Sequence, residues 1–354
     1  MKILNLSLDK KIMDKASAVA KRMAWFGDIV DRYTIVIPFF QQDKILLAEG
    51  VRAYGSGGTA RPIQFFLLYF VARRLILRDE GYDVITVQDP YFLGILGLVL
   101  SRQFQIPLEV QVHGWEQIGV LKRLIRRVVL KRATGVRVVS ERMKKDVMAC
   151  GVSEQRITVV SVYTDVRLGE KKSSEVFTFI TVARLVWVKR ILMQLSVAAT
   201  LKASGHIFQL IIVGDGEERI SLETRTRELN LLDIVHFVGW KDAVQLADLY
   251  AKSDCLLLTS DSEGWGRVIL EAGSYGVPSI MTDVGMAGEV IHNGKNGVVI
   301  PVGDQEALVE AMKRVMMDTM FYNSVAGDIK KTVQTLPTKA EILFLYVNAW
   351  KNIV

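Results

Sequence analysis

The sequence predicts an α/β protein built from two domains, each with a parallel β-sheet. Short apolar runs alternate with helical patterns from one end of the chain to the other, which is the order that parallel sheets require. The 354 residues are enough for two domains of ordinary size, and half of them are hydrophobic, so each domain can bury a core. We expect domains at residues 1–168 and 169–336, followed by a terminal helical segment, 337–354.

The first half contains apolar runs that predict strands, at residues 3–8, 33–38, 51–54, 83–88, 108–112, 135–140 and 156–160. Helices are expected between them, at 17–26, 62–77, from 89 onward, 121–132 and up to 148. The loop Gly55–Gly58 is interpreted as a turn, because no strand-to-helix pattern tightly frames it. His113 stands at the end of a strand, where ligands bind in parallel sheets, although a lone histidine there is more often a hydrogen-bonded loop residue.

The second half predicts strands at 177–182, 208–213, 235–238, 255–258, 279–283 and 297–300, with helices at 242–251, 268–275, 304–317 and 339–353. Two cations, Arg184 and Lys189, follow the first of these strands. Such a pair can converge on one diphosphate, because arginine offers a planar fork and lysine a point charge. The plainer interpretation is a pair of solvated surface cations.

The stretch from Thr259 to Glu271 organises this half of the chain. It predicts a turn that contains Gly264 and Gly266 and leads from a strand into a helix. The free N–H groups at such a helix start favour an anion, and the glycines let the backbone approach a ligand closely. Glu263 in the turn and Glu271 in the helix suit a ligand with hydroxyls on both sides of its phosphates, such as a nucleotide sugar. For an isolated pair of this kind, a helix cap and a solvated helix residue are an equally good interpretation.

Together with the later segments Gly276-Val277-Pro278, Asp283-Val284-Gly285 and Asn296-Gly297, this stretch resembles the donor-binding half of the retaining glycosyltransferases of family 4. The resemblance implies the GT-B fold, in which two Rossmann-like domains face each other across a cleft and the C-terminal helix returns to the first domain. The segment from Arg184 to Lys189 resembles a second element of the family, with Ala183 and Val188 in place of its usual glycine and acid.

The resemblance also implies roles for the site residues. Arg184, Lys189 and the helix start would hold the diphosphate. Glu271 would hold the ribose, Glu263 would position the sugar, and His113 would contact the donor sugar from the first domain. The donor-binding positions that match the family are Gly264, Trp265, Gly266, Arg267, Val268 and Glu271.

The implied reaction moves a sugar from a UDP-, GDP- or ADP-sugar to a glycan or lipid-linked acceptor of cell-surface biosynthesis. It retains the anomeric configuration by reaction on one face, with the leaving phosphate assisting deprotonation of the acceptor. No cofactor and no metal are implied, and the sequence has no Asp-x-Asp metal signature in a suitable place.

The net charge of +7 is concentrated in the first half, where residues 1–168 carry 26 Lys and Arg against 16 Asp and Glu. The basic, amphipathic segment 121–132 predicts either an ordinary helix docked on the sheet or one attracted to anionic lipid or to a phosphate-bearing acceptor. No motif supports binding to nucleic acid. We expect a cytoplasmic protein, peripheral on the inner face of the plasma membrane. Cys150 and Cys255 form no redox or metal spacing, no signal peptide is recognised, and the longest apolar run, 91–100, is too short to span a bilayer.

Two other functions remain open at this point. A nucleotide-sugar epimerase on the same scaffold would need further acid and base carboxylates near the sugar, which the sequence does not announce. A non-catalytic nucleotide-sugar-binding subunit would be favoured by loss of Arg184, Lys189 or Glu263, and all three are present. Release of nucleotide diphosphate only after an acceptor is added would identify the transferase.

Overall fold

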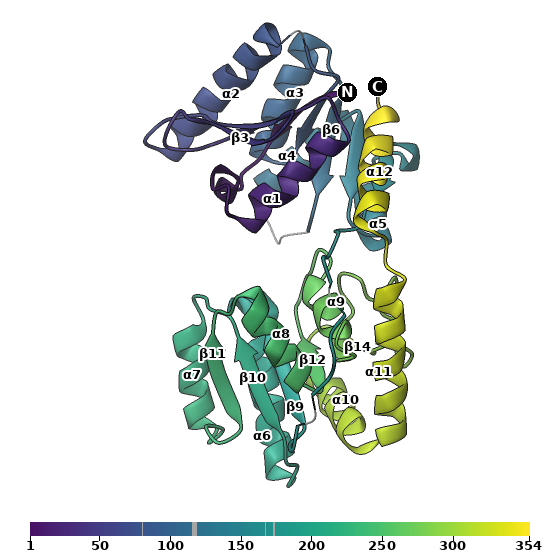
Figure 1. Ribbon diagram of the computed structural model, residues 1–354. Helices are drawn as coiled ribbons and strands as arrows, with labels where there is room; N and C mark the ends of the chain where they lie inside the picture. The colour runs from purple at the N-terminus through teal and green to yellow at the C-terminus, as the bar shows by residue number, and fades with distance from the viewer. Residues whose placement is uncertain (80, 115–118, 167, 173) are drawn as a thin grey trace. The chain divides into compact units, whose positions relative to one another are not determined.

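The computed structural model describes residues 1–79, 81–114, 119–166, 168–172 and 174–354. They form two compact units, one of residues 1–161 with 338–354 and one of residues 162–337 (Figure 1). The division falls seven residues before the expected boundary at 168. The reason is packing, because Val162 and Val166 lie against the hydrophobic core of the second unit.

The first unit contains an eight-stranded sheet in the order β3-β4-β2-β1-β5-β6-β7-β8. The strands β5, β6 and β7 are buried along their whole length, as expected for a parallel sheet with helices on both faces. The strands are β1 (Lys2–Leu6), β2 (Arg32–Ile37), β3 (Lys44–Ala48), β4 (Val51–Gly55), β5 (Val84–Val87), β6 (Leu108–Val112), β7 (Gly135–Val138) and β8 (Ile157–Val159).

The edge strand β3 was not predicted, and it is antiparallel to β4. Its residues are exposed or only partly buried, so it lacks the continuous apolar run that marks the central strands. The expectation of a wholly parallel sheet is therefore wrong at this edge. A tight turn joins the two strands, with Gly50 at a φ of 72°.

Helices cover the first sheet and the terminal helix joins them. They are α1 (Ala18–Ala24), α2 (Arg61–Arg78), α3 (Phe92–Phe104), α4 (Val120–Arg132), α5 (Glu141–Ala149) and α12 (Lys339–Lys351), with 3-10 turns at Lys10–Met13, Trp25–Asp28 and Glu154–Arg156. The loop Gly55–Gly58 runs from β4 toward α2, so it does lie between a strand and a helix. The expectation that no strand and helix frame this loop is therefore wrong.

The C-terminal helix α12 packs in the first unit, which confirms the expected return of the chain. Thr338 and Glu341 form a capping box that fixes its start. The fully buried ring of Trp350 lies beside Phe26, at 5.7 Å between ring centroids, and its Nε1–H donates to Glu109 Oε2 at 3.2 Å. The helix thus completes a hydrophobic core of the first unit, to which it contributes Leu343 and Trp350.

The second unit contains a six-stranded parallel sheet in the order β11-β10-β9-β12-β13-β14. Its strands are β9 (Thr178–Val182), β10 (Gln209–Val213), β11 (Val235–Gly239), β12 (Cys255–Leu258), β13 (Ser279–Thr282) and β14 (Val298–Ile300). Its helices are α6 (Ile191–Ala203), α7 (Arg219–Glu228), α8 (Ala243–Lys252), α9 (Arg267–Gly273), α10 (Gln305–Met317) and α11 (Thr319–Gln334), with a 3-10 turn at Trp187–Lys189. Two separate apolar clusters pack against this sheet.

The basic segment 121–132 does form a helix, α4, but most of its apolar stripe is not docked on the sheet. Only Val129 and Leu130 are buried. Leu121, Leu124 and Val128 are 71%, 56% and 43% exposed. The interpretation of α4 as an ordinary helix with a covered apolar face therefore does not describe it. Across the described ranges, no helix combines the length and the apolar character needed to cross a membrane.

Candidate active site

The predicted residues of the second unit follow neighbouring strands of its sheet. The strands β10, β9, β12 and β13 are adjacent and parallel, so their carboxyl ends lie at one edge of the sheet, here called the carboxyl edge. Arg184 and Lys189 follow β9, Glu263 follows β12 and Gly285 follows β13. Ligands bind at this edge in open parallel sheets. The fold thus gathers residues that stand up to 101 positions apart in the sequence, from Arg184 to Gly285.

At the carboxyl edge, Lys189 and Glu263 form an ion pair. Lys189 Nζ donates to Glu263 Oε1, and Ser260 Oγ donates to the same oxygen at 2.7 Å. The two side chains of the pair are 23% and 13% exposed, so both remain within reach of a ligand. The sequence suggested separate partners for them, a phosphate and a sugar. The structure shows that their charges compensate each other.

The loops after β9 and β12 are tied together by further polar contacts. Arg190 Nε donates to Asp261 Oδ1, beside the Lys189–Glu263 pair. Thr259 Oγ1 donates to the carbonyl oxygen of Lys189 at 2.9 Å and accepts from Gln194 Nε2 at 2.8 Å. These bonds fix the backbone on both sides of the ion pair, so Lys189 and Glu263 meet in a defined geometry.

Two glycines of the carboxyl edge, Gly266 and Gly285, occupy positions that favour glycine. Gly266 has a φ of 94° immediately before α9, which confirms the predicted helix start. The helix ends at Gly273, two residues short of the expected end. Gly285 has a φ of 55°, and a Cβ there would lie 2.6 Å from the carbonyl oxygen of Trp265. The loops after β12 and β13 can therefore approach each other only with glycine at this position.

Glu271 is held by two side chains. Its carboxylate accepts from the hydroxyl of Tyr250 on α8 and from Arg267, each at 3.3 Å. Burial, together with the charge of Glu271, raises the pKa of Tyr250, so the phenol keeps its proton and donates. The second carboxylate of the E-x7-E pair is thus oriented on the helix, and not simply solvated.

The other predicted site residues of the second unit differ in burial: Trp265 packs in the core and Val268 packs against it, whereas Arg184 is exposed. Trp265 is only 8% exposed and its ring packs in the core of the second unit, where Val268 also makes contact. Trp265 therefore contributes its backbone to the turn. Arg184 is exposed, and among the described residues it has no ion pair or hydrogen bond through its side chain. Its guanidinium is available to an anion. Within the described residues, no group of three or more His, Cys, Asp or Glu side chains could hold a metal ion.

His113 lies in the first unit, directly after β6. Its Nε2 is 3.0 Å from Gln111 Oε1, and Gln111 Nε2 donates to Thr86 Oγ1 at 2.7 Å. Thr86 in turn donates to Glu109, so the amide of Gln111 is oriented and presents its oxygen to the histidine. The residue reaches solvent at one side, yet desolvation and then the charge of Arg137 lower the pKa of His113. A neutral imidazole that donates through Nε2 leaves Nδ1 as an acceptor.

Two family models match the chain, one after the other. The model described as Glycosyltransferase Family 4 matches residues 35–167. The model described as Glycosyl transferases group 1 matches residues 165–332, which include the whole carboxyl edge. The chain belongs to glycosyltransferase family 4. The resemblance inferred from the glutamate–glycine stretch is thereby confirmed.

Individual relatives and a solved structure agree with this family 4 assignment. The chain is 32% identical to N-acetyl-alpha-D-glucosaminyl L-malate synthase of Bacillus anthracis over 146 residues, which are 41% of the chain and 38% of that protein. It is 27% identical to UDP-Gal:alpha-D-GlcNAc-diphosphoundecaprenol alpha-1,3-galactosyltransferase of Escherichia coli over 78% of the chain and 77% of that protein. The structure of HepE from Anabaena in complex with UDP and glucose superposes with a TM-score of 0.79 over 99% of both chains, at 19% identity. At this identity the likeness shows the fold, and the predicted GT-B fold is confirmed.

Several residues of the site in this glycosyltransferase were missed by the sequence reasoning. Ser260 and Asp261 lie inside the stretch from Thr259 to Glu271, and Arg190 directly follows Lys189. Two adjacent cations in one loop and two nearby carboxylates in the other could have indicated that the loops form ion pairs. Tyr250 and Gln194 gave no signal. They lie in ordinary helical patterns, and only tertiary packing brings them to the carboxyl edge.

Proposed function

We propose that this enzyme transfers a sugar from a nucleotide diphosphate sugar to a glycan or lipid-linked acceptor, with retention of configuration and without a metal ion. The observation that carries the proposal is the Lys189–Glu263 pair at the carboxyl edge, together with Arg184, which follows the same strand and whose exposed guanidinium has no partner among the described residues. Cations and a carboxylate side by side suit a ligand that joins a diphosphate to a sugar.

In this proposal the residues act mainly by positioning and by electrostatics. Arg184 and Lys189 bind the diphosphate and stabilise the charge that grows on it as the glycosidic bond breaks. Glu263, once Lys189 turns to the phosphate, accepts hydrogen bonds from sugar hydroxyls. Glu271 accepts from the ribose. His113 contacts the donor sugar as a neutral ring, because its pKa is lowered.

We infer that the donor is a UDP-sugar. The solved structure of HepE contains UDP and glucose, and the Escherichia coli relative is named for a UDP-Gal donor. GDP- and ADP-sugars are the alternatives. Since the same relative is named for a diphosphoundecaprenol-linked acceptor, we also infer a lipid-linked acceptor, with the enzyme cytoplasmic and peripheral on the inner face of the plasma membrane.

A thermal-shift screen against UDP, GDP, ADP and their common sugar conjugates tests the donor. Binding to the folded state alone stabilises it by about 2.7 kcal/mol at a hundredfold excess over Kd. Stabilisation by the UDP compounds alone is expected. Equal stabilisation by all three nucleotides would contradict the assignment of the base, and no stabilisation by any of them would favour a non-catalytic subunit.

Variants of the ion pair test the site. Lys189→Ala and Glu263→Ala should each lower acceptor-dependent release of nucleotide diphosphate by about 10²-fold or more, since each removes a group that acts on the transition state. Lys202→Ala is the matched control, because Lys202 also pairs with a carboxylate, Asp233, but on the exposed surface of α6. Near-normal turnover in either site variant would overturn the assignment. The anomeric configuration of the product, measured by NMR, tests retention.

A further inference from the structure

Three consecutive helices of the first unit, α2, α3 and α4, have an unusual composition. Their segments Arg61–Arg78, Phe92–Phe104 and Val120–Arg132 contain no Asp or Glu. They carry four, one and six basic residues, respectively. Ordinary surface helices mix both signs of charge, so these helices form a strongly cationic part of the surface.

The same helices expose large apolar side chains at helical spacing. The exposed residues are Ile63, Phe66, Phe70 and Leu77 on α2, Phe92, Ile95 and Val99 on α3, and Val120, Leu121, Leu124 and Val128 on α4. Soluble proteins rarely leave so many large apolar side chains uncovered on neighbouring elements. Apart from the adjacent Val120 and Leu121 and a gap of seven between Phe70 and Leu77, they recur every three or four residues within each helix, so each helix presents a stripe.

The three stripes belong to one continuous surface. Helices α2 and α3 touch through Phe65 and Phe92, whose ring centroids are 5.6 Å apart, and through a 2.7 Å hydrogen bond from Tyr69 to Gln103. Helices α3 and α4 together line a groove of about 550 Å³. We call the exposed apolar residues of α2, α3 and α4, with their basic neighbours, the apolar–basic face.

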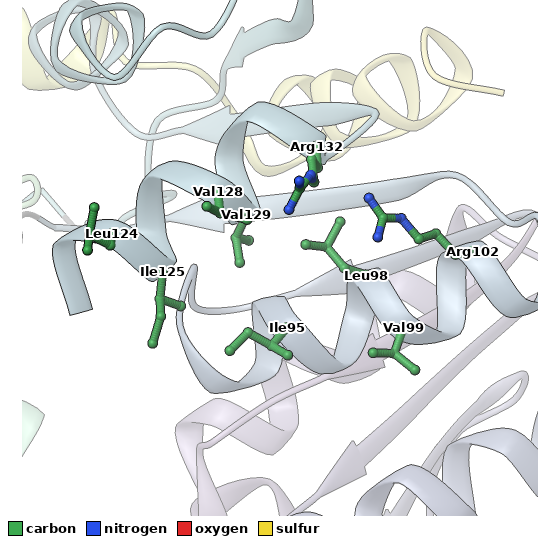
Figure 2. A pocket seen from close by; sticks show the side chains of 9 residues that line it. All are labelled: Ile95, Leu98, Val99, Arg102, Leu124, Ile125, Val128, Val129 and Arg132. Atoms are coloured by element: carbon green, nitrogen blue, oxygen red, sulfur yellow. The ribbon is translucent and has the colours of Figure 1, made fainter. Parts of the chain in front are cut away.

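The groove between α3 and α4 is apolar along most of its length and cationic at one end. Figure 2 shows Arg102 and Arg132 at the same end, with Leu124 and Ile125 toward the other. Its remaining lining residues are Ile95, Leu98, Val99, Val128 and Val129. Among the described residues, neither arginine forms an ion pair. The groove therefore offers hydrocarbon contact along its walls and two unpaired cations at its mouth.

The charge and the apolar stripes together indicate which kind of partner can bind the apolar–basic face. A second copy of this face would bring like charges together, which is unfavourable. Nucleic acid would satisfy the cations but not the aliphatic stripes of α3 and α4. An anionic bilayer satisfies both, because its head groups attract the cations and its hydrocarbon receives the apolar side chains.

We propose that the apolar–basic face docks on an anionic phospholipid bilayer, and that an acyl chain of a bilayer lipid enters the α3–α4 groove with its phosphate at Arg102 and Arg132. The inference rests on the membrane location in the proposed function and assigns to it a surface and a lipid class. The test of membrane docking uses no sugar donor and no acceptor. Docking can therefore be refuted while sugar transfer is confirmed, and sugar transfer can be refuted while docking is confirmed.

Flotation with vesicles tests the docking. The intact protein should float with vesicles of phosphatidylcholine containing phosphatidylglycerol, and not with phosphatidylcholine alone. The double variant Arg102→Gln/Arg132→Gln should lower the partition coefficient roughly 30-fold, because each cation near an anionic surface contributes about 1 kcal/mol to binding. Leu124→Glu should weaken it at least as much. Ile207→Glu is the matched control, since it makes the same kind of change at an exposed apolar residue of the second unit.

Quenching by lipids brominated on the acyl chain tests the groove. An indole placed in the groove by Val99→Trp should be quenched by brominated phosphatidylglycerol vesicles, whereas an indole placed by Ile207→Trp should not. Unchanged thermal stability and nucleotide binding establish that each variant is folded. Four results would each overturn the proposal. The first two are equal flotation with neutral and anionic vesicles and flotation of Leu124→Glu at the wild-type level. The other two are an unquenched Val99→Trp signal and self-association of the protein in place of vesicle binding.

Discussion

Replacing Glu109 by glutamine should destabilise the first unit far more than its small change in shape suggests. Glu109 is 2% exposed and accepts three hydrogen bonds, from Arg137 Nε at 3.1 Å, Thr86 Oγ1 at 2.6 Å and Trp350 Nε1 at 3.2 Å. A glutamine offers one oxygen and an NH₂ group, so at least one of these donors loses its acceptor. The buried guanidinium of Arg137 also loses its counter-charge.

The magnitude follows from these losses. Breaking a buried ion pair by removing one partner costs about 3–5 kcal/mol, because the other charge stays buried without compensation. Domains are stable by only about 5–15 kcal/mol, so the first unit should lose a large part of its stability. The double variant Glu109→Leu/Arg137→Met should regain much of the loss, since hydrophobic replacement of a buried pair is often neutral.

Hydrogen exchange in increasing urea, read by mass spectrometry, can assign the loss to one unit. Peptides from β6 and α12 should lose protection at lower urea in Glu109→Gln, while peptides from β9 and β12 should not. Glu154→Gln is the matched control, because it removes an exposed partner of Lys144 and should hardly change the free energy of unfolding. A loss below about 1 kcal/mol in Glu109→Gln, or a loss confined to the second unit, would refute the reasoning.

Three further predictions concern a glycine of the second unit, the two cysteines and the reaction. Gly285→Ala should lower the free energy of unfolding by about 1–3 kcal/mol and weaken nucleotide binding in a thermal-shift assay, because φ is positive and the new methyl group meets the carbonyl oxygen of Trp265; unchanged values would contradict this. A thiol reagent should modify Cys150 in the native protein but reach Cys255 only on unfolding, since burial raises the pKa of the Cys255 thiol; two equally fast thiols would count against it. Sugar transfer should persist after dialysis against EDTA, and its loss with recovery on adding Mg²⁺ or Mn²⁺ would contradict metal independence.

Much of the second unit was predictable because its local signals agree with each other. The runs before Arg184 and Glu263 are short and rich in apolar and β-branched residues, as buried parallel strands are, and the glycines mark the turns. The antiparallel strand β3 escaped prediction for the opposite reason, since an exposed edge strand has no such run. The boundary at Ser161 also escaped, because the burial of Val162 and Val166 is a tertiary contact.

The sequence by itself determined the α/β class, the family, and the residue types of the site, because strand and turn patterns and the E-x7-E spacing are local properties of the chain. Only the tertiary structure decided which groups meet. It paired Lys189 with Glu263, placed Tyr250 against Glu271, and buried Glu109 and Arg137 under Trp350. It also left the stripe of α4 exposed, although the same pattern would suit a docked helix. Periodicity states which side chains share a face, whereas the packing of distant elements determines whether that face is covered.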